Sequence, residues 1–152
     1  MDAKEFMTTG IVTCRTGQTL HEANLLMLEN DYSEMLVVDD EDNLVGVLTE
    51  SDYVGKNVQI PHALAPIKEL FGQTYKNQDI EKIYISSKDK KLETIVNSCP
   101  VTITPDTSLT RIVEIMRDNK LDKLPVVEKS KLVGVVTRKS LLKAFKQLSL
   151  RQ

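Results

Sequence analysis

The 152-residue sequence contains no tryptophan, two cysteines and two histidines, and only 5% of its residues are aromatic. Because aromatic side chains are few, Val, Leu, Ile and Met must fill the interior, and an apolar content of 41% suffices for one domain or two small lobes. Cys14 and Cys99 form no CxxC pair, and His21 and His62 are isolated. We therefore expect neither a disulfide framework nor a metal site.

An excess of charge of one sign and long apolar runs are also missing. The formal net charge is −2, whereas proteins that bind the phosphate backbone of a nucleic acid usually carry a clear excess of basic residues. The basic residues at 88–91 and near the C-terminus (Lys143, Lys146, Arg151) are weak support for nucleic-acid binding, since charged runs are more often solvated faces. No apolar run approaches the roughly 18 residues that span a bilayer, and the start MDAKEFMTTG has no signal pattern. These features predict a cytoplasmic protein.

What the sequence does contain is an internal repeat. The stretch LVGVLTESDYV at 44–54 returns as LVGVVTRKSLL at 132–142. When Leu20 is laid over Leu109, an offset of 89 residues, identical residues also coincide at several other positions. The offset falls by one residue from the pair Gly46 and Gly134 onward. A register kept over this length indicates two homologous lobes.

Each lobe is predicted to fold as β-α-β-β-α. Apolar residues at helical spacing begin at Leu20 and at Leu109, and Thr19 with Glu22 forms a capping-box pattern. A polar turn between two apolar runs predicts a hairpin in each lobe, and a second helix is expected to begin after Thr49 and after Thr137. The expected strands are 12–15, 35–38 and 44–48 in the first lobe, and 101–104, 124–127 and 132–136 in the second. Strands this apolar are typical of burial on both faces, one against the lobe's own helices and one against the sister lobe.

An insert without a counterpart separates the lobes, so the predicted domains are 1–56, 57–91 (the insert) and 92–152. Pro61 and Pro66 oppose a continuous helix in its first half, and the charged stretch NQDIEKIYISSKDKK is partly helical in pattern. The apolar residues from Pro61 to Phe71 are expected to pack on a neighbouring surface, which could belong to a second chain.

The repeated phrase carries a candidate binding motif in its first copy. Thr49 ends a strand and Asp52 lies three residues further on. Both side chains would face the N-terminal end of the following helix. An ionised carboxylate has two acceptor oxygens and can receive both hydroxyls of a ribose, while the helix N-terminus could hold a phosphate nearby. The same Thr-x-x-Asp pattern also serves as a helix cap that stabilises folding by about 1 kcal/mol and binds nothing. On the phrase alone, both interpretations stay open.

The order and spacing of these pieces, found twice, resemble a tandem pair of cystathionine β-synthase (CBS) domains, also called a Bateman module. The resemblance rests on Val-Thr in each first strand, Met-Leu-Val-Val or Leu-Pro-Val-Val in the second, and the closing Gly-Val-Leu-Thr-Glu-Ser-Asp. The resemblance covers nearly the whole chain except the insert. It implies an α/β (α+β) fold of two lobes related by a pseudo-two-fold axis and packed through their sheets.

The resemblance also implies ligand crevices built across the two lobes. The intact crevice would pair residues around Asp52 with the first strand and the second-strand approach of the other lobe: Leu48, Thr49 and Asp52 with Pro100, Val101, Thr102, Lys120, Leu121, Lys123 and Pro125. Val101 would meet an adenine edge, Leu121 and Pro125 would sandwich the base, and Lys120 or Lys123 would meet phosphate. Asp122 departs from the pattern, because an acid there repels a polyphosphate unless it points away.

The second crevice is predicted to be degenerate. Ser140 stands where the acid belongs, and Leu36 replaces the expected proline of the second strand. Its members would be Ile11, Val12, Thr13, Tyr32, Ser33, Met35, Thr137, Arg138, Lys139 and Ser140. Tyr32 could stack on a base or could simply pack at the end of its helix. This crevice is expected to be empty or to take something more anionic.

No catalytic constellation is visible in the sequence, so we expect no enzyme. The leading prediction is a stand-alone regulatory module without a cofactor that binds an adenosine-containing ligand and signals in trans to an effector protein. Candidate ligands are AMP, ADP, ATP, S-adenosylmethionine and a cyclic dinucleotide. The alternative is an oligomerisation or protein-interaction platform whose crevices bind nothing. Under both hypotheses we expect a homodimer.

Overall fold

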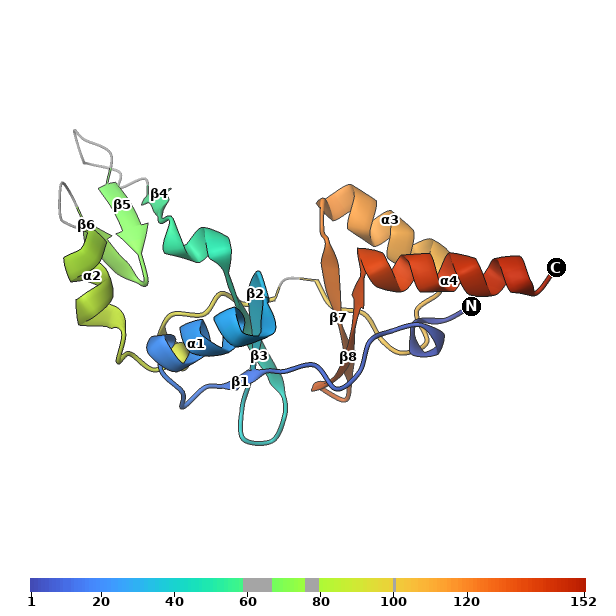
Figure 1. Ribbon diagram of the computed structural model, residues 1–152, viewed down its shortest axis with the longest axis horizontal. Helices are drawn as coiled ribbons and strands as arrows, with labels where there is room; N and C mark the ends of the chain where they lie inside the picture. Colours follow the sequence, from blue (N-terminus) through green and yellow to red (C-terminus); the bar gives the residue numbers. More distant parts are fainter. Residues whose placement is uncertain (59–66, 76–79, 100) are drawn as a thin grey trace. The chain divides into compact units, whose positions relative to one another are not determined.

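The computed structural model describes residues 1–58, 67–75, 80–99 and 101–152 (Figure 1). The chain divides into two compact units. The first, here called the Asp52 unit, consists of Val12–Asp40 and Val45–Ser98, and the second, the Ser140 unit, consists of Met1–Ile11, Glu41–Leu44 and Cys99–Gln152. Thus the segment before each repeat's first strand belongs to the unit of the other repeat, which the repeat boundaries alone do not show.

The Asp52 unit is a small mixed sheet with helices, followed by the insert. Its sheet has the order β1-β2-β3, and β1 runs parallel to β2 with Cys14 opposite Val37. The insert adds a separate antiparallel sheet of order β4-β5-β6. The elements are β1 (Cys14–Arg15), α1 (Leu20–Asn30), β2 (Glu34–Val38), β3 (Leu44–Thr49), the 3-10 turn η2 (Glu50–Tyr53), β4 (Lys56–Val58), β5 (Ile67–Leu70), β6 (Gln73–Tyr75), α2 (Ile80–Ser87) and η3 (Leu92–Thr94).

The Ser140 unit repeats this plan in a simpler form. Its strands β7 and β8 pair antiparallel, and Ile103 makes a single parallel bridge to Val126 at the position equivalent to Cys14 and Val37. The first strands are therefore shorter than the sequence predicted, two residues in one lobe and one bridge in the other. The elements are η1 (Ala3–Glu5), α3 (Leu109–Asn119), β7 (Lys123–Glu128), β8 (Lys131–Thr137) and α4 (Arg138–Leu150).

Local signals explain where α1 and α3 begin and end. The hydroxyl of Thr19 accepts a hydrogen bond from the Glu22 amide at 3.2 Å, as an N-cap does. The Glu22 carboxylate, expected to reach back to Thr19, accepts the side-chain amide of Gln18 at 3.3 Å. Both helices end at a residue in the left-handed conformation, Asp31 (φ 55°) in α1 and Lys120 (φ 53°) in α3. The equivalent helices thus have equivalent ends.

The two cores are built from equivalent positions of the repeat. Core residues of the Asp52 unit are Cys14, Leu20, Ala23, Met27, Met35, Val37, Leu48, Leu70, Phe71, Ile83 and Leu92. Those of the Ser140 unit are Ala3, Phe6, Ile103, Ile112, Met116, Leu124, Val126, Val136 and Ala144. Most members correspond at the sequence offset, but Leu70, Phe71 and Ile83 come from the insert. In the Asp52 unit the insert therefore supplies core residues, as α4 supplies Ala144 in the other unit.

The glycine of the repeated phrase is needed for a close approach of backbone. A Cβ atom on Gly46 would lie 2.5 Å from the carbonyl oxygen of Asn97, and one on Gly134 would lie 3.0 Å from that of Thr8. At both places an isolated antiparallel bridge joins the neighbouring valine of the strand to the segment before a repeat, Val47 to Asn97 and Val135 to Thr8. Hence each copy of Leu-Val-Gly-Val marks the docking of that segment.

The helix expected after Thr49 is only a four-residue 3-10 helix, so the long helix that follows Thr137 has no counterpart there. Only the four-residue turn η2 forms before Gly55, whose φ of 87° ends it and leads into β4. In contrast, α4 has no Gly or Pro between Arg138 and Leu150 and forms fully. Hence the helical part of the insert that the structure describes, α2, begins much later in the chain.

The expectation that Pro61 to Phe71 packs on a neighbouring surface can be compared with the structure only at the end of this segment. Residues 61–66 lie outside the described part of the chain. Leu70 and Phe71, which are described, are 1% and 6% exposed and belong to the core of their own unit. They are buried because the β5–β6 hairpin turns them inward, a fold that the sequence pattern did not indicate.

Among the residues that the structure describes, no helix has the length and apolar character needed to cross a membrane.

Candidate functional site

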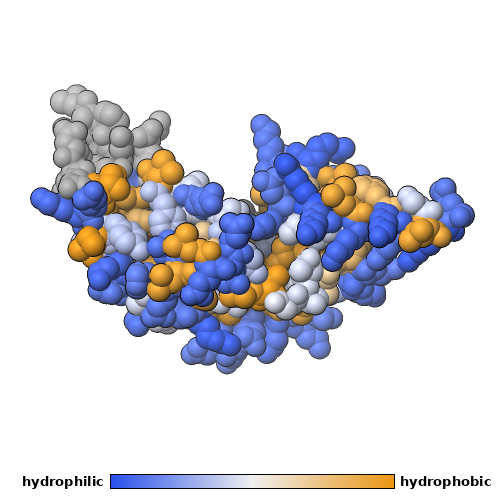
Figure 2. Space-filling model, in the orientation of Figure 1, coloured by the Kyte–Doolittle hydropathy of each residue, from blue (hydrophilic) through white to orange (hydrophobic). Residues whose placement is uncertain are grey.

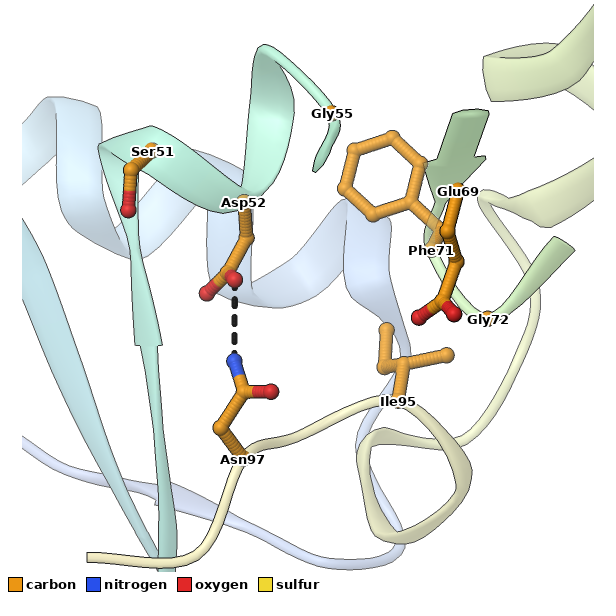
Figure 3. Close-up of a pocket in the computed structure, with 8 residues that line it drawn as sticks. All are labelled: Ser51, Asp52, Gly55, Glu69, Phe71, Gly72, Ile95 and Asn97. Atoms are coloured by element: carbon orange, nitrogen blue, oxygen red, sulfur yellow. Dashed lines mark hydrogen bonds between the residues drawn. The ribbon is translucent and has the colours of Figure 1, made fainter. Parts of the chain in front are cut away.

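Asp52 is held at both carboxylate oxygens, and all its partners lie in its own unit. Its Oδ2 atom accepts the backbone N–H of Thr49 at 2.8 Å and the Thr49 hydroxyl at 3.3 Å. Its Oδ1 atom accepts the side-chain amide of Asn97 at 2.8 Å (Figure 3). The hydroxyls of Thr49 and Ser51 are 2.6 Å apart. The carboxylate therefore caps its own turn, as the simpler interpretation of the motif predicted, and is also fixed from outside the turn.

Sequence reasoning missed Asn97, although a signal for it exists. The residue at the equivalent position of the other repeat is Thr8, and Thr8 Oγ1 lies 3.4 Å from Ser140 Oγ. Extending the repeat N-terminal to its first strand pairs Ala3 with Leu92 as well, and both are fully buried. The docked segment thus brings one polar side chain to the acid, or to its replacement, in each lobe.

A cavity of about 170 Å³ lies beside Asp52 within the Asp52 unit. Three stretches of chain contribute to it: the η2 turn, the β5–β6 hairpin and the segment after η3 (Figure 3). Its described lining residues are Ser51, Asp52, Gly55, Glu69, Phe71, Gly72, Ile95 and Asn97. The hairpin residues of this wall come from the insert, so the repeat has no equivalent for them.

Phe71 anchors the hairpin to the turn that carries Asp52. Its ring meets Tyr53 edge-on at a centroid distance of 5.1 Å and Tyr84 of α2 at 5.9 Å. Phe71 adopts a φ of 51°, a left-handed conformation that costs a non-glycine residue about 1–2 kcal/mol. Gly72 follows at φ 74°, and two positive φ values in a row are typical of a tight hairpin turn. The ring contacts therefore offset a strained backbone at the cavity wall.

The two tyrosines beside Phe71 keep their hydroxyls inside the protein. Within the described part of the chain, neither the Tyr53 nor the Tyr84 hydroxyl has a hydrogen-bond partner, and both atoms are buried. Burial raises the pKa of the Tyr53 phenol, with a smaller contribution from Tyr84. The Tyr53 phenol thus remains a neutral donor at physiological pH, next to Asp52 in the same turn.

The equivalent place in the Ser140 unit is closed by its own side chains. Ser140 is 1% exposed, and its hydroxyl lies within 3.4 Å of three groups, the Thr137 amide, the Thr137 hydroxyl and the Thr8 hydroxyl. In return, the Ser140 amide donates to the Thr137 hydroxyl at 3.1 Å, which completes a capping box at the start of α4. In the second lobe, then, the motif works as a helix cap.

The predicted members of the intact crevice fall into both units. Leu48, Thr49 and Asp52 belong to the Asp52 unit, where Leu48 is fully buried and can offer a ligand only its backbone. Pro100 lies outside the described residues. The others belong to the Ser140 unit: Val101, Thr102, Lys120, Leu121, Lys123 and Pro125. The cross-lobe set stays a prediction.

Tyr32 and Asp122 also have structural partners. Tyr32 accepts the Val12 amide on its hydroxyl at 3.4 Å, and its ring packs against the core of its own unit. Asp122 pairs with Arg138 at the surface of the Ser140 unit. The Asp122 carboxylate is thus paired with a base, and its side chain is 69% exposed.

The phosphate-holding helix N-terminus expected at Thr49 needs correction. Because η2 is a four-residue 3-10 turn, it provides no array of aligned backbone amides of the kind an α-helix offers to an anion. The chemistry that the described residues present at Asp52 is that of fixed hydrogen-bond acceptors beside a partly apolar cavity.

Comparison with known proteins shows which family these features belong to. The CBS domain family matches residues 3–56 and 92–147. The chain is 26% identical over 144 residues to the uncharacterized protein MJ1404 of Methanocaldococcus jannaschii, covering 95% of this chain and 32% of that protein. It is 25% identical over 126 residues to the mitochondrial CBS domain-containing protein CBSX3 of Arabidopsis thaliana, covering 82% of this chain and 51% of that protein. The chain therefore spans about a third to a half of these relatives.

Solved structures share the fold over nearly the whole chain. The crystal structure of CBSX2 from Arabidopsis thaliana in complex with AMP covers 97% of this chain, and the chain covers 98% of it, with a TM-score of 0.71 and 22% identity. At this identity the likeness establishes the α/β fold of the two lobes. With two family matches that flank the insert and this shared fold, the chain belongs to the CBS domain family, as a tandem pair of CBS domains.

Proposed function

We propose that the chain is a regulatory module that binds one adenosine-containing nucleotide at Asp52 and signals to a separate effector protein. The observation that carries the proposal is the geometry of Asp52, a carboxylate fixed by Thr49 and Asn97 at the edge of a cavity. The ribose would lie against Asp52. The base and phosphate would reach the predicted residues of the other lobe, including Val101, Leu121 and Lys123.

The bonds that Asp52 already makes leave room for a ribose. A carboxylate has about four acceptor sites, two on each oxygen. The Thr49 amide uses one site on Oδ2 and the Asn97 amide one on Oδ1. Because the Thr49 hydroxyl can donate to Ser51 instead of Asp52, one site remains on each oxygen, as two neighbouring hydroxyls require.

Relatives support a nucleotide as the ligand. The CBSX2 structure was solved in complex with AMP, and its fold covers this chain almost completely. A ligand that touches both lobes would favour one arrangement of the module, and a partner that distinguishes the arrangements would read the change. The sensing role therefore needs no catalytic group.

Thermal unfolding with added nucleotides tests the proposal. A ligand at 100 times its Kd stabilises the folded state by about 2.7 kcal/mol, which is readily measured as a rise in Tm. We expect at least one of AMP, ADP, ATP, S-adenosylmethionine or a cyclic dinucleotide to raise the Tm of the wild type and to leave that of Asp52→Ala unchanged. The proposal is wrong if none of them raises the wild-type Tm, or if Asp52→Ala responds as the wild type does.

A second candidate function, association into a homodimer, has its own support. Apolar side chains reach the surface over α4 (Figure 2), where Leu142, Phe145 and Leu150 are 69%, 49% and 76% exposed. Exposed apolar patches are typical of interaction sites. Sedimentation over a range of concentrations, with the wild type and with Phe145→Lys, would detect the dimer. Repeating it with nucleotide would show whether association depends on the ligand.

A further inference from the structure

The insert gives the Asp52 site a wall that the repeat does not explain. Glu69, Phe71 and Gly72 of the β5–β6 hairpin face the cavity beside Asp52 and Asn97 (Figure 3). No equivalent of this hairpin exists in the second repeat, whose motif runs directly into α4. Any ligand selectivity that this hairpin confers is therefore specific to the insert and does not follow from the repeat.

The size of the cavity limits what it can hold. An apolar cavity of about 150 Å³ is known to accommodate a single benzene ring. The cavity beside Asp52 measures about 170 Å³, so it has room for one ring and not for a whole nucleotide. A nucleotide bound at Asp52 would thus place one ring here and the rest elsewhere.

The described lining favours a ring that carries hydrogen-bond donors. The carboxylates of Asp52 and Glu69 are pure acceptors when ionised, whereas Phe71 and Ile95 offer apolar surface. A phosphate would bring its negative charge close to two carboxylates, which is unfavourable. A sugar or base ring has both a face for the apolar side and O–H or N–H groups for the acceptors.

The wall is also held in a fixed relation to Asp52. Phe71 packs edge-on against Tyr53, the residue next to Asp52 in η2. The Glu69 backbone belongs to β5, which pairs with β6 from Lys68 to Leu70. A site whose two sides are joined by packing in this way loses little conformational freedom when a ligand binds.

We propose that this cavity receives the ribose ring of the ligand and that Glu69 is its specificity-determining residue. The inference rests on the proposed function, since it assigns an orientation to the nucleotide held at Asp52. The Glu69 carboxylate accepts a donor of the ring, and Phe71 supports the face of the ring. The phosphates point away from the insert.

Calorimetric titration with adenosine, AMP and ATP tests the assignment in two variants and a control. We expect Glu69→Gln to weaken adenosine, AMP and ATP alike, about tenfold, since a hydrogen bond to a charged carboxylate becomes one to a neutral amide oxygen. Glu69→Lys, which removes the acceptor, should weaken all three ligands to a similar degree, because they share the ribose and their phosphates point away from the insert. Asp89→Asn, an exposed acid of the same unit outside the cavity, should bind all three as the wild type does.

The outcomes separate this inference from the proposed function. If the wild type binds an adenosine compound but both Glu69 variants keep its affinity and its ATP-to-adenosine ratio, the role of Glu69 is refuted and the proposed function stands. A rise of the ATP-to-adenosine affinity ratio in Glu69→Lys would place the phosphates beside the insert, and a lowered Tm of both variants without ligand would indicate a structural role. Either result would likewise overturn the assignment. If no adenosine compound binds the wild type, both proposals fail.

Discussion

The two lobes carry the same phrase, yet they treat its ninth position, Asp52 or Ser140, in opposite ways. In the Asp52 unit, an acid meets Asn97 at 2.8 Å beside a cavity of about 170 Å³. In the Ser140 unit, a hydroxyl meets Thr8 at 3.4 Å and is 1% exposed. Both members of the contact differ between the lobes, Asp52 with Asn97 in one and Ser140 with Thr8 in the other, so each lobe has a matched pair. One pair presents a charged acceptor, and the other completes a helix cap.

The lobes also differ in the stretch of chain after the motif. Arg138 opens a helix of thirteen residues, whereas Glu50 opens a four-residue turn and leads into the insert. Insert residues then complete the core of the Asp52 unit. The insert is thus part of the folding unit that carries the candidate site, and it also forms one wall of that site.

The largest effect is expected where the insert replaces a helix. Leu70→Ala removes a side chain that is 1% exposed, and such truncations cost about 2–5 kcal/mol. Leu142→Ala, which truncates a side chain 69% exposed on α4, should change stability by about 0.5 kcal/mol or less. Urea unfolding of both variants measures the difference, and equal effects would mean that the insert does not share the core.

The next effect separates the two glycines of the phrase. A Cβ on Gly46 would press on the Asn97 carbonyl at 2.5 Å, whereas a Cβ on Gly134 meets the flexible end of Met7 first, at 2.7 Å. Gly46→Ala should therefore cost about 1–3 kcal/mol, and Gly134→Ala less. Thermal unfolding of the pair checks this order. The reverse order would show that the docked segments are held differently from the arrangement described above.

A smaller effect comes from exchanging the matched pairs. Ser140→Asp buries a carboxylate whose partner outside the turn is the Thr8 hydroxyl, which should destabilise the fold by about 1–2 kcal/mol. Adding Thr8→Asn restores the donor found at Asn97 and should recover part of that loss, with a coupling of about 1 kcal/mol. Additive effects in a double-mutant cycle would mean that the two positions are not a pair.

The smallest effect uses another difference between equivalent positions, Cys14 and Ile103. Burial raises the pKa of the Cys14 thiol from 9.0 to about 11. The neutral thiol is favoured in the fold, so this stability is complete below pH 9 and is lost as the pH rises through 11, about 1 kcal/mol at pH 10. Unfolding at pH 8 and pH 10 should show the loss, and Cys14→Ile should reduce it. An unchanged slope in that variant would assign the loss to other groups.

Much of the fold could be predicted because the repeat is strong. The helices beginning at Leu20 and Leu109 and both hairpins were predicted within a residue or two. The helix after Thr49 is a 3-10 helix of four residues and no equivalent of α4, because Gly55 interrupts this stretch. The hairpin around Phe71 left no readable signal, since its turn places a phenylalanine in a conformation that usually requires glycine.

The candidate site was predicted in part. Thr49 and Asp52 follow from the motif, whereas Asn97 comes from a segment 45 residues away and required the repeat to be extended. Glu69 and Phe71 belong to an insert without a counterpart, so no comparison within the chain could identify them. Long-range contacts made by unrepeated segments need the three-dimensional structure.

The most direct test of the account is the number of nucleotides bound per chain. Calorimetric titration with the nucleotide that raises the Tm most should give one site per chain in the wild type, the same in Ser140→Ala, and none in Asp52→Ala. Two sites per chain, or a site that survives Asp52→Ala, would contradict the claim that the chain has one nucleotide site and that this site depends on the carboxylate of the first lobe.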